Sequence, residues 1–169
     1  MSCLNSILEG LLTSLDKETA LYQDLLLLLQ REKEAVVGLA LDDLNEGNKE
    51  KETLILQARV FEEARLVMLD KLGNQMGISS DKLTLSYLSD LVEEPYSTKL
   101  KAHRSNLLSL FHSIQDINRV NEGLISHSLD CIAGSWSLLS NMVSSGSIYL
   151  NTGQIQNGNK NGRLIRGRI

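Results

Sequence analysis

The first 36 residues contain an apolar repeat whose spacing alternates between four and three residues. This spacing keeps one face of a helix turned towards a partner helix, as in a coiled coil. The repeat consists of Leu4, Leu8, Leu11, Leu15, Glu18, Tyr22, Leu25, Leu29, Glu32 and Val36. A carboxylate in such a seam costs stability unless it reaches water or a cation, so Glu18 and Glu32 can fix the register between helices.

A second repeat with the same spacing begins near Tyr96 and predicts another long helix. Its seam consists of Tyr96, Leu100, His103, Leu107, Leu110, Ile114, Ile117, Asn121, Leu124, Ser128, Cys131, Ser135, Leu138 and Met142. Its last third carries a second apolar stripe, formed by Ile125, Leu129, Ile132, Trp136, Leu139 and Val143. Gly123 and Gly134 lie in this region, and each costs about 1 kcal/mol of helix propensity relative to Ala. We therefore expect this helix end to be stable only when it is packed.

The segment between the two repeats predicts one further long helix and one short helix. Asp42 or Asp43 can cap the long helix by accepting a backbone N–H bond, and Gly73–Asn74 is a suitable C-cap. Ser80–Asp81 is expected to begin the short amphipathic helix. This helix should end before Pro95, because the residue before a proline avoids helical geometry.

Composition supports an all-α fold, because Leu dominates the apolar residues while aromatic residues make up only 4% of the chain. We expect three long antiparallel helices in a coiled-coil-like bundle, with one short helix, over residues 1–144. Residues 145–169 are rich in Gly and Asn, and their low hydrophobicity predicts a flexible tail. The tail is basic, since no acidic residue follows position 144 and four basic residues do: Lys160, Arg163, Arg166 and Arg168.

The sequence offers no site for catalysis, metal binding or a cofactor. Glu18 and Glu32 are 14 residues apart, about 21 Å along a helix at roughly 1.5 Å per residue, so one active site cannot use both. The three histidines, His103, His112 and His127, have no mutual spacing of four, and the cysteines do not complete a ligand set. Glycine-rich phosphate loops and nucleophile motifs are absent.

Charge and hydropathy also limit the partners and the location of the chain. Residues before position 144 carry 13 basic and 21 acidic residues, and an acidic body disfavours nucleic-acid binding. The run Leu25 to Leu29 is far too short to span a membrane, which needs about 20 apolar residues. The N-terminus lacks the features of a signal peptide, so we expect a reduced, cytoplasmic protein without stable membrane insertion.

The wide apolar face at the end of the last helix has three interpretations. It could be core packed on the other long helices, a surface for self-association, or a groove for the amphipathic helix of a partner. A three-helix coiled coil needs one stripe per helix, so the surplus stripe must be covered by the short helix, a second copy or a ligand. We expect a partner to bind Leu124, Ile125, Leu129, Ile132, Trp136, Leu139 and Val143, with Trp136 as the best single anchor.

Several segments, taken in order, resemble the FlgN family of bacterial flagellar type III export chaperones. They are the leucine-rich first helix with Glu18, the segments 32–44 (EKEAVVGLALDDL), 49–54 (KEKETL) and 62–65 (EEAR), the Asn118 and Asn121 pair with Leu124–Ile125 and Ser128–Leu129, and the C-terminal Tyr149 to Gly153. The resemblance covers roughly residues 4 to 153. The chain departs from the family pattern after Gly153 and at Gly134.

The resemblance implies a cytoplasmic chaperone without ATP hydrolysis of its own. Such chaperones bind the C-terminal helical segments of the hook–filament junction (hook-associated) proteins, prevent their premature assembly and deliver them to the membrane export apparatus. By this resemblance Tyr149 is a candidate for contact with the export apparatus. The alternative is a structural coiled-coil protein that self-assembles into a homo-oligomer.

Overall fold

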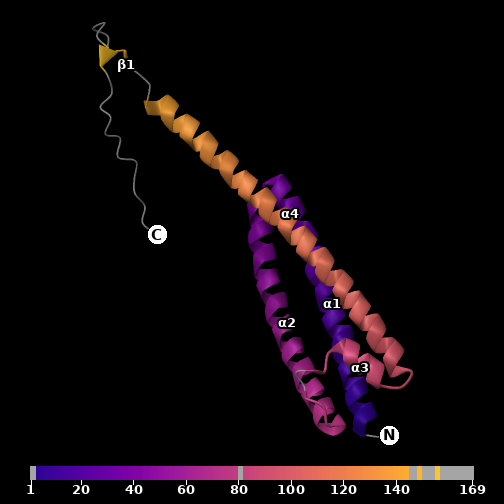
Figure 1. The fold of residues 1–169 in the computed structure, drawn as a ribbon. Helices are drawn as coiled ribbons and strands as arrows, with labels where there is room; N and C mark the ends of the chain where they lie inside the picture. Colours follow the sequence, from indigo (N-terminus) through magenta and orange to yellow (C-terminus); the bar gives the residue numbers. More distant parts are fainter. Residues whose placement is uncertain (1–2, 80–81, 145–147, 150–154, 157–169) are drawn as a thin grey trace. The chain divides into compact units, whose positions relative to one another are not determined.

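The computed structural model describes residues 3–79, 82–144, 148–149 and 155–156, and within them the chain is almost entirely helical (Figure 1). The helices are α1 (Cys3–Gly38), α2 (Leu41–Met76), α3 (Leu85–Leu91) and α4 (Tyr96–Ser144). The all-α prediction of long helices with one short helix is confirmed. The chain divides into two compact units, residues 1–124 and 125–169.

In the first unit, α1, α2 and the beginning of α4 run up, down and up (Figure 1). Glu18 contacts Arg65 and Glu32 contacts Lys51, so residue numbers rise along α1 as they fall along α2. His103 lies 3.6 Å from Asp16, and Asn121 reaches Leu29, so numbers rise together along α1 and α4. Successive long helices are therefore antiparallel as expected, while α1 and α4 are parallel.

The core of this unit lies where all four helices meet. Its buried side chains are Leu8, Leu11, Leu12, Leu15, Leu69, Leu72, Leu83, Leu88, Leu100 and Leu107. The α4 members and, apart from Leu12, the α1 members follow the predicted seams, and α2 contributes Leu69 and Leu72. Further along, the rings of Tyr22 and Phe111 pack with their centroids 4.7 Å apart. Leucine therefore forms nearly all of the buried contact among these helices, as expected for a sequence with few aromatic residues.

The turn between α1 and α2 differs from the expected one. α2 starts at Leu41, and the preceding residue, Ala40, makes no side-chain cap bond. The prediction that Asp42 or Asp43 caps this helix is therefore wrong. Both residues lie inside its first turn, where a carboxylate interacts favourably with the positive end of the helix dipole. Leu39 occupies the left-handed region with φ 54°, and the Ala40 N–H donates to the Ala35 oxygen to close α1.

The other end of α2 also differs, because the helix continues to Met76 and ends at Gly77. Gly77 has φ 69°, and the N–H groups of Gly77 and Ile78 both donate to the Gly73 oxygen. This is a Schellman-type cap, which places its glycine just after the helix. The predicted C-cap at Gly73–Asn74 is wrong because Gly73 is buried inside the last turns.

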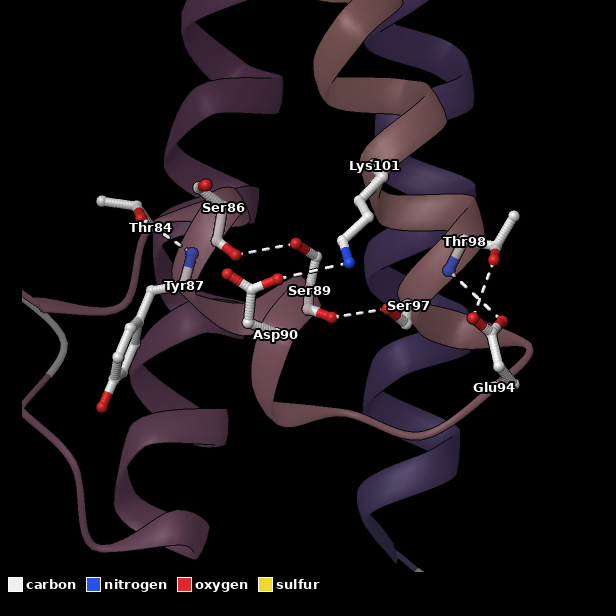
Figure 2. A network of polar contacts seen from close by, with 9 residues as sticks. All are labelled: Thr84, Ser86, Tyr87, Ser89, Asp90, Glu94, Ser97, Thr98 and Lys101. Atoms are coloured by element: carbon white, nitrogen blue, oxygen red, sulfur yellow. Dashed lines mark hydrogen bonds and ion pairs between the residues drawn. The ribbon is translucent and has the colours of Figure 1, made fainter.

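α3 begins at Leu85, later than predicted, because Thr84 caps it by accepting a bond from the Tyr87 N–H (Figure 2). The expected start at Ser80–Asp81 lies outside the described residues. α3 ends before Pro95 as predicted. The Ser97 hydroxyl then donates to the Ser89 oxygen, which joins the buried side of α3 to the first turn of α4.

The second unit contains the rest of α4 and a two-residue ladder. α4 remains helical through Gly123 and Gly134 to Ser144. Strand β1 (Ile148–Tyr149) pairs antiparallel with β2 (Ile155–Gln156), a feature that the sequence analysis did not predict. Residues 145–147, 150–154 and 157–169 of the expected flexible tail lie outside the described residues, and the flexibility of the tail stays a prediction.

Candidate partner-binding surface

A buried ion pair fixes the register of α1 on α2. The Glu18 side chain is 0% exposed, and its Oε2 accepts a bond of 3.2 Å from Arg65. Burial raises the pKa of the Glu18 carboxyl above its ordinary value, while the positive charge of Arg65 opposes the rise. The Glu18 carboxylate in the seam therefore contacts a cation, one of the two conditions under which a seam carboxylate is tolerated.

A second polar cluster fixes the register of α4 on α1. Asn121 is 2% exposed, and its Nδ2 donates to the Leu29 carbonyl oxygen at 2.8 Å and to Glu32 Oε2 at 2.9 Å. The other oxygen of Glu32 accepts from Lys51 of α2. Glu32 thus links α1, α2 and α4, because it receives a donor from each neighbouring helix.

The character of α4 changes after this cluster. Between Ile125 and Val143, large apolar side chains are exposed, with Ile125 at 37%, Trp136 at 64% and Val143 at 78%. The other large apolar residues exposed there are Leu129, Ile132, Leu138, Leu139 and Met142. The interpretation of this stripe as core therefore does not hold.

The geometry of an α-helix places these residues on one broad face. Successive residues are about 100° apart, so two stripes offset by one residue cover about half of the helix circumference. The remaining half carries small or polar residues such as Ser126, Ala133 and Ser137. Between Leu124 and Ser144 the sequence contains one carboxylate, Asp130, and neither Lys nor Arg. We call the exposed apolar residues from Ile125 to Val143 the α4 apolar face.

The structure brings most of the predicted partner-binding residues together on this face. Ile125, Leu129, Ile132, Trp136, Leu139 and Val143 are exposed members of it. Leu124 is half-buried and is the last residue of the first unit. Tyr149 lies in β1, away in sequence from the face, and its role stays a prediction.

One side-chain pair on this helix escaped the sequence analysis. His127 Nε2 lies 3.7 Å from the sulfur of Cys131, one turn later. A histidine–cysteine spacing of four places the two side chains on one face of the helix, a signal that spacings between histidines alone do not contain. In the part of the chain that the structure describes, no group of three potential metal ligands occurs.

A family model described as FlgN protein matches residues 1–157. The chain belongs to the FlgN family. The match includes all four helices and therefore both the first unit and the α4 apolar face. No curated protein and no solved structure matches the chain.

Membership of the FlgN family makes the chain a flagellar export chaperone in general terms and confirms the resemblance noted in the sequence. FlgN proteins are a chaperone family and are not known as enzymes. Among the described residues, no helix has both the length and the apolarity needed to cross a membrane. Within the family pattern, Asn121, Glu18 and Arg65 now have a structural explanation, since they hold the three long helices in register.

Proposed function

We propose that this chain is a cytoplasmic chaperone that binds C-terminal helical segments of hook–filament junction proteins through the α4 apolar face. Binding would prevent premature assembly of these clients, which the chaperone then delivers to the export apparatus. The observation that carries the proposal is a broad apolar face left exposed on a helix whose sequence has one carboxylate over 21 residues.

The chemistry of the face suits an amphipathic client helix. Full burial of one large apolar side chain contributes about 1.5–3 kcal/mol, so several of them outweigh the cost of ordering a client segment. Contacts at spacings of three and four match the apolar stripe of a helix. Since the face has almost no charge, its affinity should depend little on salt.

Trp136 provides both the test and its readout, because it is the only tryptophan in the chain. Titration with tryptophan-free peptides from the C-termini of junction proteins should shift its emission to shorter wavelength as the ring leaves water. By calorimetry, Trp136→Ala should weaken binding by at least about tenfold, as expected for a central anchor. Helicity by circular dichroism should remain unchanged.

Leu108→Ala is the matched control, since Leu108 is an exposed apolar residue on α4 outside the face. It should leave client affinity unchanged. Equal effects of the two substitutions, or unfolding of the Trp136→Ala chain, would remove the support for the α4 apolar face as the client site.

A second copy of the chain is the competing occupant, because the same exposed face could support self-association into a structural coiled coil. Light scattering over a range of concentrations separates the two. A mass that stays monomeric without client supports the chaperone, whereas a concentration-dependent mass together with no client binding favours the structural protein.

Tyr149 is proposed to contact the export apparatus, on family resemblance alone. Tyr149→Ala should therefore leave the affinity for client peptides unchanged while reducing export of the client in cells. A loss of client affinity would place Tyr149 in the client site instead.

A further inference from the structure

A cleft of about 980 Å³ lies in the first unit, on residues that the proposed function does not use. It is lined by α2 between Arg65 and Lys71, by residues 83–86 at the start of α3, and by Arg104 of α4. Of its apolar lining residues, Leu69 and Leu83 are buried, while Leu66 and Val67 are more than half exposed. A cleft with this apolar lining can accommodate an apolar side chain of a partner.

The charges around this cleft are unusual for the chain. Three basic residues line it, Arg65, Lys71 and Arg104, against one acidic residue, Asp70. The rest of the helical body has the opposite balance, with more acidic than basic residues. Anionic partners are therefore not attracted by the body as a whole, and attraction at the cleft has to come from its own local cations.

The three cations are not equivalent. Arg65 bonds the buried Glu18 and is committed to the helix interface. Lys71 and Arg104 form no ion pair with any residue that the structure describes, and both are exposed. Asp70 accepts a hydrogen bond of 3.4 Å from the Asn74 side chain, one turn later on its own helix. Two cations thus remain available beside an apolar hollow.

We infer that this cleft binds an amphipathic helix of a partner protein whose apolar stripe is flanked by carboxylates. The apolar residues of the helix contact Leu66, Val67 and Leu83, while its carboxylates pair with Lys71 and Arg104. A basic segment is disfavoured by the same two cations, which argues against the basic tail of a second copy. This site is independent of the α4 apolar face, so the chain can hold two helical partners at different places.

Two synthetic helical peptides, each of about five turns, provide the probe. Both carry the same leucine stripe and no tryptophan; one has glutamates and the other lysines beside the stripe. Binding to the full chain is measured by fluorescence anisotropy of a label on the peptide. The glutamate peptide should bind about tenfold more tightly than the lysine peptide, since two charge pairs change from attraction to repulsion.

The double variant Lys71→Glu with Arg104→Glu should reverse this preference, whereas Lys33→Glu, a charge reversal at an exposed position on α1, should preserve it. Higher salt should reduce the difference between the peptides. Equal affinities for the two peptides, or a preference that survives the double variant, would overturn the inference.

Trp136 emission distinguishes failure of this inference from failure of the proposed function. A glutamate peptide in the cleft should leave the emission unchanged, and Leu66→Asn should weaken its binding without affecting client peptides. If the peptide instead shifts Trp136 emission, it occupies the α4 apolar face and the cleft has not bound it.

Discussion

Leu39 has a backbone conformation that is unfavourable for leucine. It occupies a left-handed position after α1, where glycine is usual, while the glycine of this turn stands one residue earlier at Gly38. Its side chain is 68% exposed and so gains little from burial. Gly38 is the residue of this turn best suited to a left-handed conformation, whereas the backbone places that conformation, and its strain, on the leucine.

Leu39→Gly should stabilise the chain by about 0.5–1 kcal/mol, because it relieves the cost of a left-handed leucine and offsets the greater entropy of an unfolded glycine. The urea midpoint should rise with an unchanged slope. Leu56→Gly is the matched control: Leu56 is similarly exposed but lies inside α2, so this change should cost about 1 kcal/mol. Destabilisation by both changes would contradict the assignment of strain to Leu39.

Glu18 gives the stability of the fold a dependence on pH. Because burial raises its pKa in the folded chain, the folded state binds the proton more tightly than the unfolded state. This group therefore adds stability as the pH falls from 7 through the folded-state pKa, and the gain is complete below the ordinary value of 4.5.

Glu18→Gln removes this contribution while it keeps an acceptor for Arg65. The free energy of unfolding of the natural chain, minus that of the variant, should increase as the pH is lowered from 7 towards about 4.5. Urea unfolding at a series of pH values measures it. A difference that decreases over this range would show that the Arg65 charge dominates over burial.

At the scale of helices, the polar residues in the seams decide how the elements are aligned. Leucine seams tolerate slippage by a heptad, because each step presents similar residues, whereas a polar residue at one position specifies the register. Here Glu18 aligns α1 with α2, and Asn121 aligns α4 with α1. Both were visible in the sequence as interruptions of the seams.

Asn121→Ala should destabilise the chain by about 1–3 kcal/mol, because it leaves the Leu29 carbonyl and the Glu32 carboxylate without this donor. Asn118→Ala should cost less than about 0.5 kcal/mol, since Asn118 donates to the exposed Glu122 on its own helix. Chemical denaturation measures both. Similar costs for the two asparagines would mean that the α1–α4 register does not depend on Asn121.

The elements themselves were predictable, and the contacts between them were less so. Repeats of three and four over 30 or more residues indicated α1 and α4, because such repeats have few other physical explanations. The sequence pattern missed the true caps at Thr84 and Gly77, since several glycines and hydroxyl residues stand near each end. Periodicity did identify the residues of the α4 apolar face. The Glu18–Arg65 pairing, however, depends on how two helices are aligned, and the pattern of a single helix carries no information about that alignment.

At the scale of the molecule, stability and proposed binding belong to different units. All residues of the leucine core precede Leu124, whereas the exposed face follows it. A chain that ends at Ser128 should therefore unfold cooperatively with nearly the natural urea midpoint, yet bind no client peptide. A large loss of stability would show that the second unit supports the first.

The spacing of these contacts along the chain has a consequence for how the protein forms during synthesis. The α1–α2 pairs join residues 19 to 47 positions apart, while the α1–α4 bonds join residues about 90 apart. Closing the longer loop costs more entropy, and α4 leaves the ribosome last. The hairpin of α1 and α2, with its carboxylate–guanidinium pair, should thus assemble first and serve as the template on which α4 docks.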